Sequence, residues 1–182
     1  MLVQGGFSCI RHSDFVIRHS PLTLAPMPEI ESDRLIPIVC GVQLKAELGD
    51  RPLAYRVEAE VRRRLEELLG KPVPGELPKL TPIVLSDVYY LNNEELQNRP
   101  AIAIGGPGVN LLAANLVEEL PTALTIENVL VVQMDLELKD LRCSVWGMDH
   151  LSTVRAVETF IVKGYLDTFV KAVVEKAKTE ET

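Results

Sequence analysis

The chain has 182 residues, which suits one domain with a sizeable core. It carries 26 acidic and 19 basic side chains, a net charge of −7, and only 5% aromatic residues. Nucleic-acid binders use basic surfaces and aromatic stacking groups, so we expect no nucleic-acid partner. No apolar run reaches the length of a membrane span, so we also expect no membrane association.

Residues 1–26 differ from the rest of the chain. The tetrapeptide IRHS occurs at residues 10–13 and again at 17–20, and no basic start followed by an apolar stretch marks a secretory signal. Ordinary globular patterning begins at Met27. We therefore predict that residues 1–26 are a disordered leader or precede the true translation start. Residues 27–182 are predicted to form a single cytoplasmic domain.

The first elements of that domain are a strand and a helix. The apolar run Leu35–Cys40 predicts a buried strand. Residues 49–50 (Gly-Asp) predict a turn, and Pro52 suits the first turn of the helix that follows. Apolar residues at helical spacing predict this helix over Ala54–Leu69. The arginines at 62–64 are typical of a solvated helix face.

The middle of the chain alternates short apolar runs with polar segments. Four prolines in residues 71–82 predict a stiff extended connection. A strand is predicted over Ile83–Tyr90, followed by a polar turn or short helix over Asn92–Asn98. A second apolar strand is predicted over Ala101–Ile104, and a helix over Val109–Leu120.

The last third predicts a hairpin and a long helix. Strands are predicted over Val129–Met134 and Leu141–Trp146, and their short link permits only an antiparallel pair. Helical spacing runs over Ser152–Lys178, with Gly164 kinking or dividing the helix. Strands separated by amphipathic helices predict a three-layer α/β domain. Its sheet is expected to be mainly parallel, with about five strands and one antiparallel edge hairpin.

The glycine-rich segment 105–110 (GGPGVN) follows a predicted strand and precedes a predicted helix. Free backbone N–H groups and the positive helix end make such a turn an anion site. The segment is neither a Walker A loop nor a dinucleotide fingerprint. We predict ligand binding by Gly105, Gly106, Gly108 and Asn110. The alternative is a tight turn in which glycine permits close packing and Asn110 caps the helix.

A second candidate segment, residues 147–153 (GMDHLST), opens the last helix. Asp149 and Thr153 are predicted to bind ligand. Neighbouring Asp149 and His150 are candidates for acid–base catalysis, as is Asp87 at the end of an apolar run. The alternative for the first pair is a capped helix start with an exposed histidine. The alternative for Asp87 is an aspartate that bonds a turn.

Metal ligands and reactive thiols are few. After residue 26 the chain has one histidine, His150, and two cysteines, Cys40 and Cys143. This set is too small for a usual four-ligand zinc site, so we expect no metal and no cofactor. Sparse cysteines suit a reducing cytosol.

Taken together, the two segments resemble a pattern in archaeal S-layer proteins and bacterial cell-wall-binding repeats. The pattern is strand-GGP-x-x-N followed by G-x-D-x-x-x-T-x-x-A. The matching positions are Gly105, Gly106, Pro107 and Asn110, then Gly147, Asp149, Thr153 and Ala156. The resemblance covers less than a third of the chain. It implies a non-catalytic α/β module with a cell-surface or polymer-binding role, whose two loops lie side by side at one sheet edge.

Three functions remain open. The first is a non-enzymatic binding or scaffold module. The second is an enzyme or sensor for a small phosphate- or carboxylate-bearing ligand, and the third is a homo-oligomer built through an apolar patch on the last helix. The expected partner is accordingly a small anion or a protein. A concave pocket holding an aspartate or histidine with a shifted pKa would favour the ligand site over a purely structural edge.

Overall fold

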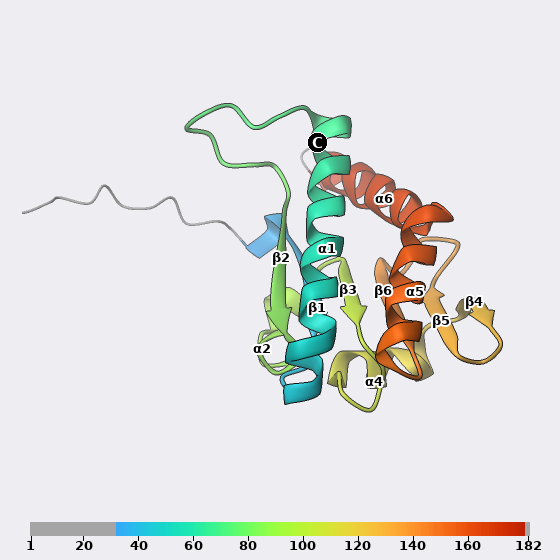
Figure 1. The fold of residues 1–182 in the computed structure, drawn as a ribbon. Coiled ribbons are helices and arrows are strands. Elements are labelled where there is room, and N and C mark those ends of the chain that lie inside the picture. The colour runs from blue at the N-terminus through green and yellow to red at the C-terminus, as the bar shows by residue number, and fades with distance from the viewer. Residues whose placement is uncertain (1–31, 181–182) are drawn as a thin grey trace, which may run out of the picture.

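The computed structural model describes residues 32–180, so the predicted leader 1–26 lies outside the described residues. Residues 32–180 form one six-stranded sheet with helices on both faces (Figure 1). The strands are β1 (Leu35–Cys40), β2 (Thr81–Ser86), β3 (Ala101–Ile104), β4 (Thr122–Ile126), β5 (Leu130–Met134) and β6 (Arg142–Gly147). The helices are η1 (Ser32–Arg34), α1 (Leu44–Leu69), α2 (Asp87–Leu91), α3 (Glu94–Gln97), α4 (Leu111–Glu119), α5 (His150–Val162) and α6 (Tyr165–Glu180).

The sheet has the strand order β2-β1-β3-β6-β5-β4. Strands β2, β1, β3 and β6 are parallel, whereas β5 runs antiparallel to both β6 and β4. This confirms the predicted α/β fold, its mainly parallel sheet and its antiparallel edge. The sequence analysis places no strand at β4. As a partly exposed edge strand, β4 has threonine at its first and fourth positions and shows no long continuous apolar run.

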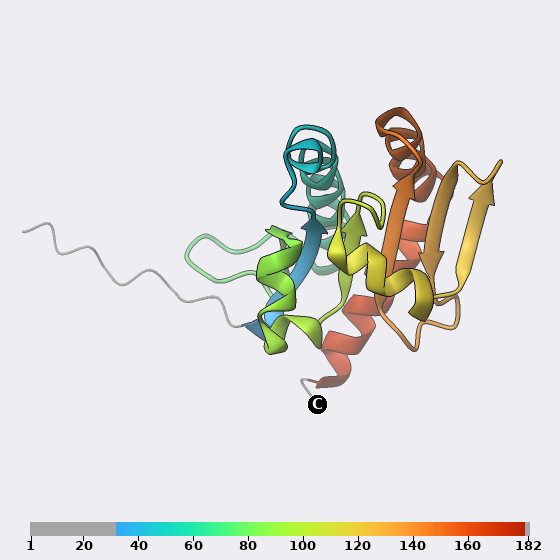
Figure 2. The ribbon, with the colours of Figure 1, turned by 90° about the horizontal axis from the view of Figure 1, so that it is seen from below.

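The sheet separates two apolar cores. Figure 2 shows the helices on either side of it. Helices α1, α5 and α6 cover one face, and α2, α3 and α4 cover the other. Strand β1 contributes Ile36 and Ile38 to the first core and Val39 to the second. Because both faces are covered, the central strands are apolar at nearly every position, which explains why β1 and β3 are readable from sequence.

Helix α1 begins at Leu44, so the predicted turn at residues 49–50 is wrong. Ala46, Asp50 and Leu53 lie on one buried face of the helix, at helical spacing. Packing of this face against the sheet stabilises a helix that contains Pro52, although an interior proline costs about 3 kcal/mol. Packing of α1 against the sheet therefore keeps residues 49–50 helical, although Gly-Asp is a sequence typical of turns.

The predicted strand over Ile83–Tyr90 is wrong in its second half, because β2 ends at Ser86 and α2 follows at once. The Ser86 side chain accepts a hydrogen bond from the backbone N–H of Tyr89 (3.2 Å) and caps α2. Asp87 stands in the first turn of α2, where its charge suits the helix end. A serine–aspartate pair at the end of an apolar run is thus a helix start here.

The predicted long C-terminal helix is divided into α5 and α6 at Gly164, which has φ +81. The apolar stripe of α6 is buried in the first core, so this stripe offers no exposed patch for an oligomer contact. Helix α6 is also tied to α1, because Arg64 is buried and donates to Asp167 (2.6 Å). The predicted solvated face therefore holds for Arg62 and Arg63 but not for Arg64.

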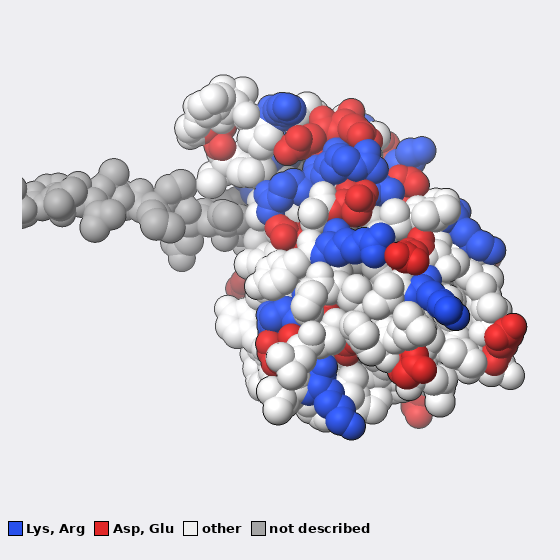
Figure 3. Space-filling view, viewed as in Figure 1, with Lys and Arg blue, Asp and Glu red and all other residues white. Residues whose placement is uncertain are grey.

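Charged side chains of both signs gather over the upper part of α1 in the view of Figure 3. The opposite end of α1, near its start, lies beside the carboxyl-terminal ends of the parallel strands (Figure 1). None of the helices between residues 32 and 180 combines the length and apolarity that a membrane span requires.

Candidate functional site

A pocket of about 850 Å³ lies at the carboxyl-terminal edge of the parallel strands. Its walls come from the start of α1, the loop after β3 and the loop after β6. The chain leaves β1 through α1 on one face of the sheet and leaves β3 through α4 on the other face. Such a switch point opens a crevice in α/β folds, and the volume suits a small molecule.

Glycines at the strand ends bring the loops into close contact. Gly41 follows β1, and a Cβ atom there would overlap the backbone carbonyl of Val109. Gly147 ends β6, and a Cβ atom there would overlap the backbone of Ser152 in α5. A Cβ atom added at Gly106 would lie only 3.7 Å from the carbonyl oxygen of Gly147. The glycine-rich loop and residues 147–150 therefore lie side by side.

Asn110 is buried and has all its hydrogen-bonding groups in use within the chain. Its side-chain amide donates to the carbonyl oxygens of Val39 and Ile104, both at 3.0 Å. Its side-chain oxygen accepts from the backbone N–H groups of Leu112 (3.0 Å) and Ala113 (3.3 Å). Asn110 therefore joins the ends of β1 and β3 to the start of α4, as in the capping alternative, and does not line the pocket.

Asp87 is 1% exposed and braces three segments. One carboxylate oxygen accepts from the backbone N–H groups of Val42 (3.2 Å) and Val88 (2.8 Å). The other accepts from the N–H of Leu111 (2.9 Å), the first residue of α4. The first backbone N–H groups of α4, which were predicted to bind an anion, therefore donate hydrogen bonds to Asp87 and Asn110 instead. Asp87 itself lies outside the pocket lining.

In the second predicted segment, Asp149 caps α5. Its carboxylate accepts from the backbone N–H and the hydroxyl of Ser152, each at 2.7 Å. The Ser152 hydroxyl bond, followed by the backbone bond, lowers the pKa of Asp149. Thr153 is buried, accepts from the N–H of Gly147 (3.1 Å) and donates to the carbonyl of Asp149 (2.9 Å). His150 is exposed on the pocket wall.

Asp50, on α1, is the residue that the sequence analysis missed. It is only 8% exposed and lines the pocket. Within residues 32–180 its carboxylate has no hydrogen-bond or salt-bridge partner. Gly105, with φ +98, approaches so closely that a Cβ atom there would overlap the Asp50 carboxylate. Burial raises the pKa of Asp50, and the charge of nearby His150 offsets part of this shift.

One signal in the sequence marks Asp50. It falls at helical spacing between Ala46 and Leu53, on the apolar stripe of α1. A carboxylate on such a stripe is unusual, because burying an unpaired charge is unfavourable. Interpreting residues 49–50 as a turn hid this signal.

The pocket therefore gathers some predicted residues and leaves others out. Gly106, Gly108, Asp149, His150 and Thr153 line it. The backbone at Gly105 approaches the pocket carboxylate Asp50, whereas Asn110 and Asp87 serve the neighbouring backbone.

Within residues 32–180, neither the cysteines nor the potential metal-ligating side chains form a second candidate site. Burial is the main cause that raises the pKa of the Cys40 thiol to about 11, and burial likewise raises the pKa of Cys143. Both thiols are therefore protonated near neutral pH and are poor nucleophiles. Across residues 32–180, no group of three or more histidine, cysteine, aspartate or glutamate side chains is arranged to hold a metal ion.

No protein-family model matches the chain, and no curated protein matches it significantly. The resemblance to S-layer and cell-wall-binding modules therefore stays a prediction.

Proposed function

We propose that this chain is a binding module for a small molecule, held in the pocket between α1 and the loops after β3 and β6. The observation that carries the proposal is the Asp50 carboxylate, buried at the pocket and without a hydrogen-bond or salt-bridge partner within residues 32–180. Partial removal of a carboxylate from water without a partner is unfavourable. A ligand that supplies the missing partner explains why the chain keeps an aspartate there.

A purely structural edge would have a different character. Its buried polar groups would all be bonded within the chain, as those of Asn110 and Asp87 are. A concave pocket that holds an aspartate with a shifted pKa is the feature expected of a ligand site. Asp50 has that feature, and this supports small-ligand binding over a scaffold role.

The proposal does not use the predicted anion site. The first backbone N–H groups of α4 already donate to Asp87 and Asn110. A phosphate at that helix start would have to displace two buried side chains. We therefore place the ligand against Asp50 and the loop glycines Gly106 and Gly108 that line the pocket.

A second candidate function is proton transfer on the bound molecule. It is favoured by the raised pKa of Asp50 and by His150, which lies against Gly49 and acts electrostatically on Asp50. A carboxyl group with a raised pKa is suited to general acid–base work. If this candidate holds, the wild type converts the bound molecule and Asp50→Asn does not, even at ligand concentrations high enough to saturate the variant. Pure binding gives no conversion with either protein.

A ligand screen with the full chain tests the proposal. Nucleotides, phosphates, carboxylates, amines and divalent metals are added singly, and the melting temperature is recorded. A ligand at 100 times its dissociation constant stabilises the fold by about 2.7 kcal/mol, which is several degrees for a domain of this size. We expect at least one class to stabilise the wild type and not Asp50→Asn.

The matched control is Asp33→Asn, which removes the same charge at an exposed position just before β1, at the opposite end of the strands. This variant should respond to the ligand like the wild type. A screen in which no compound stabilises the wild type, or in which every hit stabilises Asp50→Asn equally, would overturn the proposal.

A further inference from the structure

We propose that the molecule bound in this pocket is a small organic ammonium ion whose N–H groups donate to Asp50 and whose apolar body lies against Trp146. This inference rests on the proposed function and names the chemical class of its ligand. Three features carry it: the charge of the pocket floor, the apolar walls and the exposed apolar rim.

The first feature is the charge. An ionised carboxylate accepts hydrogen bonds and cannot donate them, so a ligand that binds Asp50 must supply a hydrogen-bond donor. An anionic ligand would be repelled by Asp50, and a neutral donor would leave its charge uncompensated. An ammonium ion both donates hydrogen bonds and compensates the negative charge of Asp50. Such charge-assisted hydrogen bonds are stronger than hydrogen bonds between neutral groups.

Within residues 32–180, no side chain supplies such a cation at hydrogen-bonding distance from Asp50. The other titratable side chains of the pocket lining are Lys45, Asp149 and His150. Lys45 is exposed and makes no salt bridge with Asp50, and Asp149 is occupied with Ser152. His150 acts on Asp50 through its charge, but no hydrogen bond joins the two side chains. The position facing the Asp50 carboxylate therefore stays open to a ligand cation.

The second feature is the wall formed by Trp146. The indole N–H of Trp146 donates to the side-chain oxygen of Gln133 (3.4 Å), so its polar atom is already engaged. The ring lies beside Gly106, whose lack of a side chain leaves room next to it, and lines the pocket. A tryptophan ring is the best aromatic surface for a cation and also packs well against hydrocarbon.

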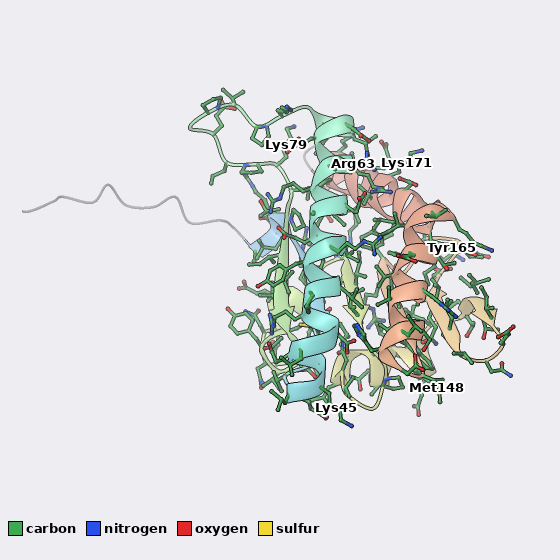
Figure 4. The ribbon with its side chains drawn as sticks, in the orientation of Figure 1. Lys45, Arg63, Lys79, Met148, Tyr165 and Lys171 are labelled. Carbon is green, nitrogen blue, oxygen red and sulfur yellow. The ribbon has the colours of Figure 1, made fainter. Side chains whose placement is uncertain are left out.

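The third feature is the rim of the pocket, where large apolar side chains are exposed to solvent. Leu48 on α1 is 74% exposed and Met148 before α5 is 70% exposed, and both line the pocket. Figure 4 shows Met148 at the same end of the molecule as Lys45, where α1 begins. Large apolar side chains exposed together around a concavity are typical of a binding site. They suit the apolar body of a ligand whose charged end reaches Asp50.

The test uses three probes of one shape and different charge: benzylamine, benzyl alcohol and benzoate. Trp146 is the one tryptophan of the chain, so its fluorescence reports on this pocket directly. The full-length wild type is titrated at neutral pH. We expect saturable binding of benzylamine, at least about tenfold tighter than benzyl alcohol, and no binding of benzoate. This comparison needs no variant and so does not depend on the folding of one.

Variants then assign the preference to Asp50. Asp50→Asn should weaken benzylamine binding by at least about tenfold while changing benzyl alcohol binding by less than about twofold. Asp33→Asn should change neither. Equal binding of benzylamine and benzyl alcohol, or undiminished benzylamine binding by Asp50→Asn, would overturn the ammonium assignment.

The broad ligand screen separates the two proposals. If a neutral or anionic compound binds and its binding requires Asp50, the ammonium assignment fails and small-molecule binding stands. If neither the three probes nor any screened compound binds the wild type, both proposals fail together.

Discussion

Two buried aspartates lie near the carboxyl-terminal edge of the same sheet and differ in almost every contact. Asp87 accepts three backbone hydrogen bonds, from Val42, Val88 and Leu111. Asp50 accepts none from residues 32–180, although it is only 8% exposed. Burial alone therefore does not identify a functional carboxylate. What distinguishes the two is whether the surrounding backbone satisfies the charge.

The comparison has a structural cause. Asp87 begins α2 and faces the start of α4, so free N–H groups of two helix ends point at it. Asp50 lies inside α1, where the neighbouring N–H groups are used by the helix itself. The side chains three and four residues from Asp50 on α1 are alanine, glutamate and leucine and offer no donor, so a partner has to come from outside the helix, where the pocket lies.

The largest expected effect is the loss of Asp87. Asp87→Ala leaves three backbone N–H groups without their acceptor and separates α2 from α4. Breaking a buried charged network of this kind is expected to lower the free energy of unfolding by about 3–5 kcal/mol. Urea denaturation at neutral pH measures it. A loss below about 1 kcal/mol would show that Asp87 does not brace this edge.

The next largest destabilisation is expected from a side chain at Gly105, whose backbone lies against the Asp50 carboxylate. Gly105→Ala places a side chain at positive φ and against the Asp50 carboxylate, and should destabilise the fold by about 2 kcal/mol. Gly106→Ala is the matched control, because a Cβ atom there meets no atom closer than 3.7 Å. Its change should stay within about 0.5 kcal/mol.

A double variant sharpens this result. If the overlap with Asp50 contributes, adding Asp50→Ala to Gly105→Ala should recover part of the lost stability. Strict additivity of the two single changes would show that backbone strain at Gly105 alone is responsible.

Asp50→Asn should be stabilising at pH 7 in the absence of ligand, because the unpaired charge is gone. The raised pKa of Asp50 sets the pH dependence. The native state holds the proton more tightly than the unfolded chain, so the wild type loses stability as pH rises from the ordinary aspartate pKa through the raised value. Unfolding midpoints of both proteins across this range measure the difference. A difference that does not change with pH would contradict it.

The smallest effects are expected at the start of α5. Asp149→Ala removes the cap, and its destabilisation should be well below that of Asp87→Ala. The pKa of Asp149 is lowered, so its contribution is present above the ordinary aspartate pKa and is lost as pH falls through the lowered value. His150→Ala is the control and should stay within about 0.5 kcal/mol, since the side chain is exposed. Thermal melts at several pH values test both.

The sequence by itself determined much of the fold. The apolar runs at Leu35–Cys40 and Ala101–Ile104 are strands because both sheet faces are covered, and Gly164 divides the last helix because its backbone has positive φ. The two pocket loops were also visible, as a glycine-rich segment at residues 105–110 and a polar segment at residues 147–153, each at a strand end. These features are readable because local composition and periodicity report directly on burial and on backbone conformation.

Which polar groups are satisfied depends on contacts between segments that are distant in the sequence. Asn110 and Asp87 look like site residues in the sequence, but partners distant in the chain, such as Val39 and Leu111, use up their hydrogen bonds. Asp50 looks like a turn residue, but packing of α1 carries it to the pocket without a partner. Hydrogen-bond satisfaction depends on which segments meet in space, and spacing along one chain does not report it.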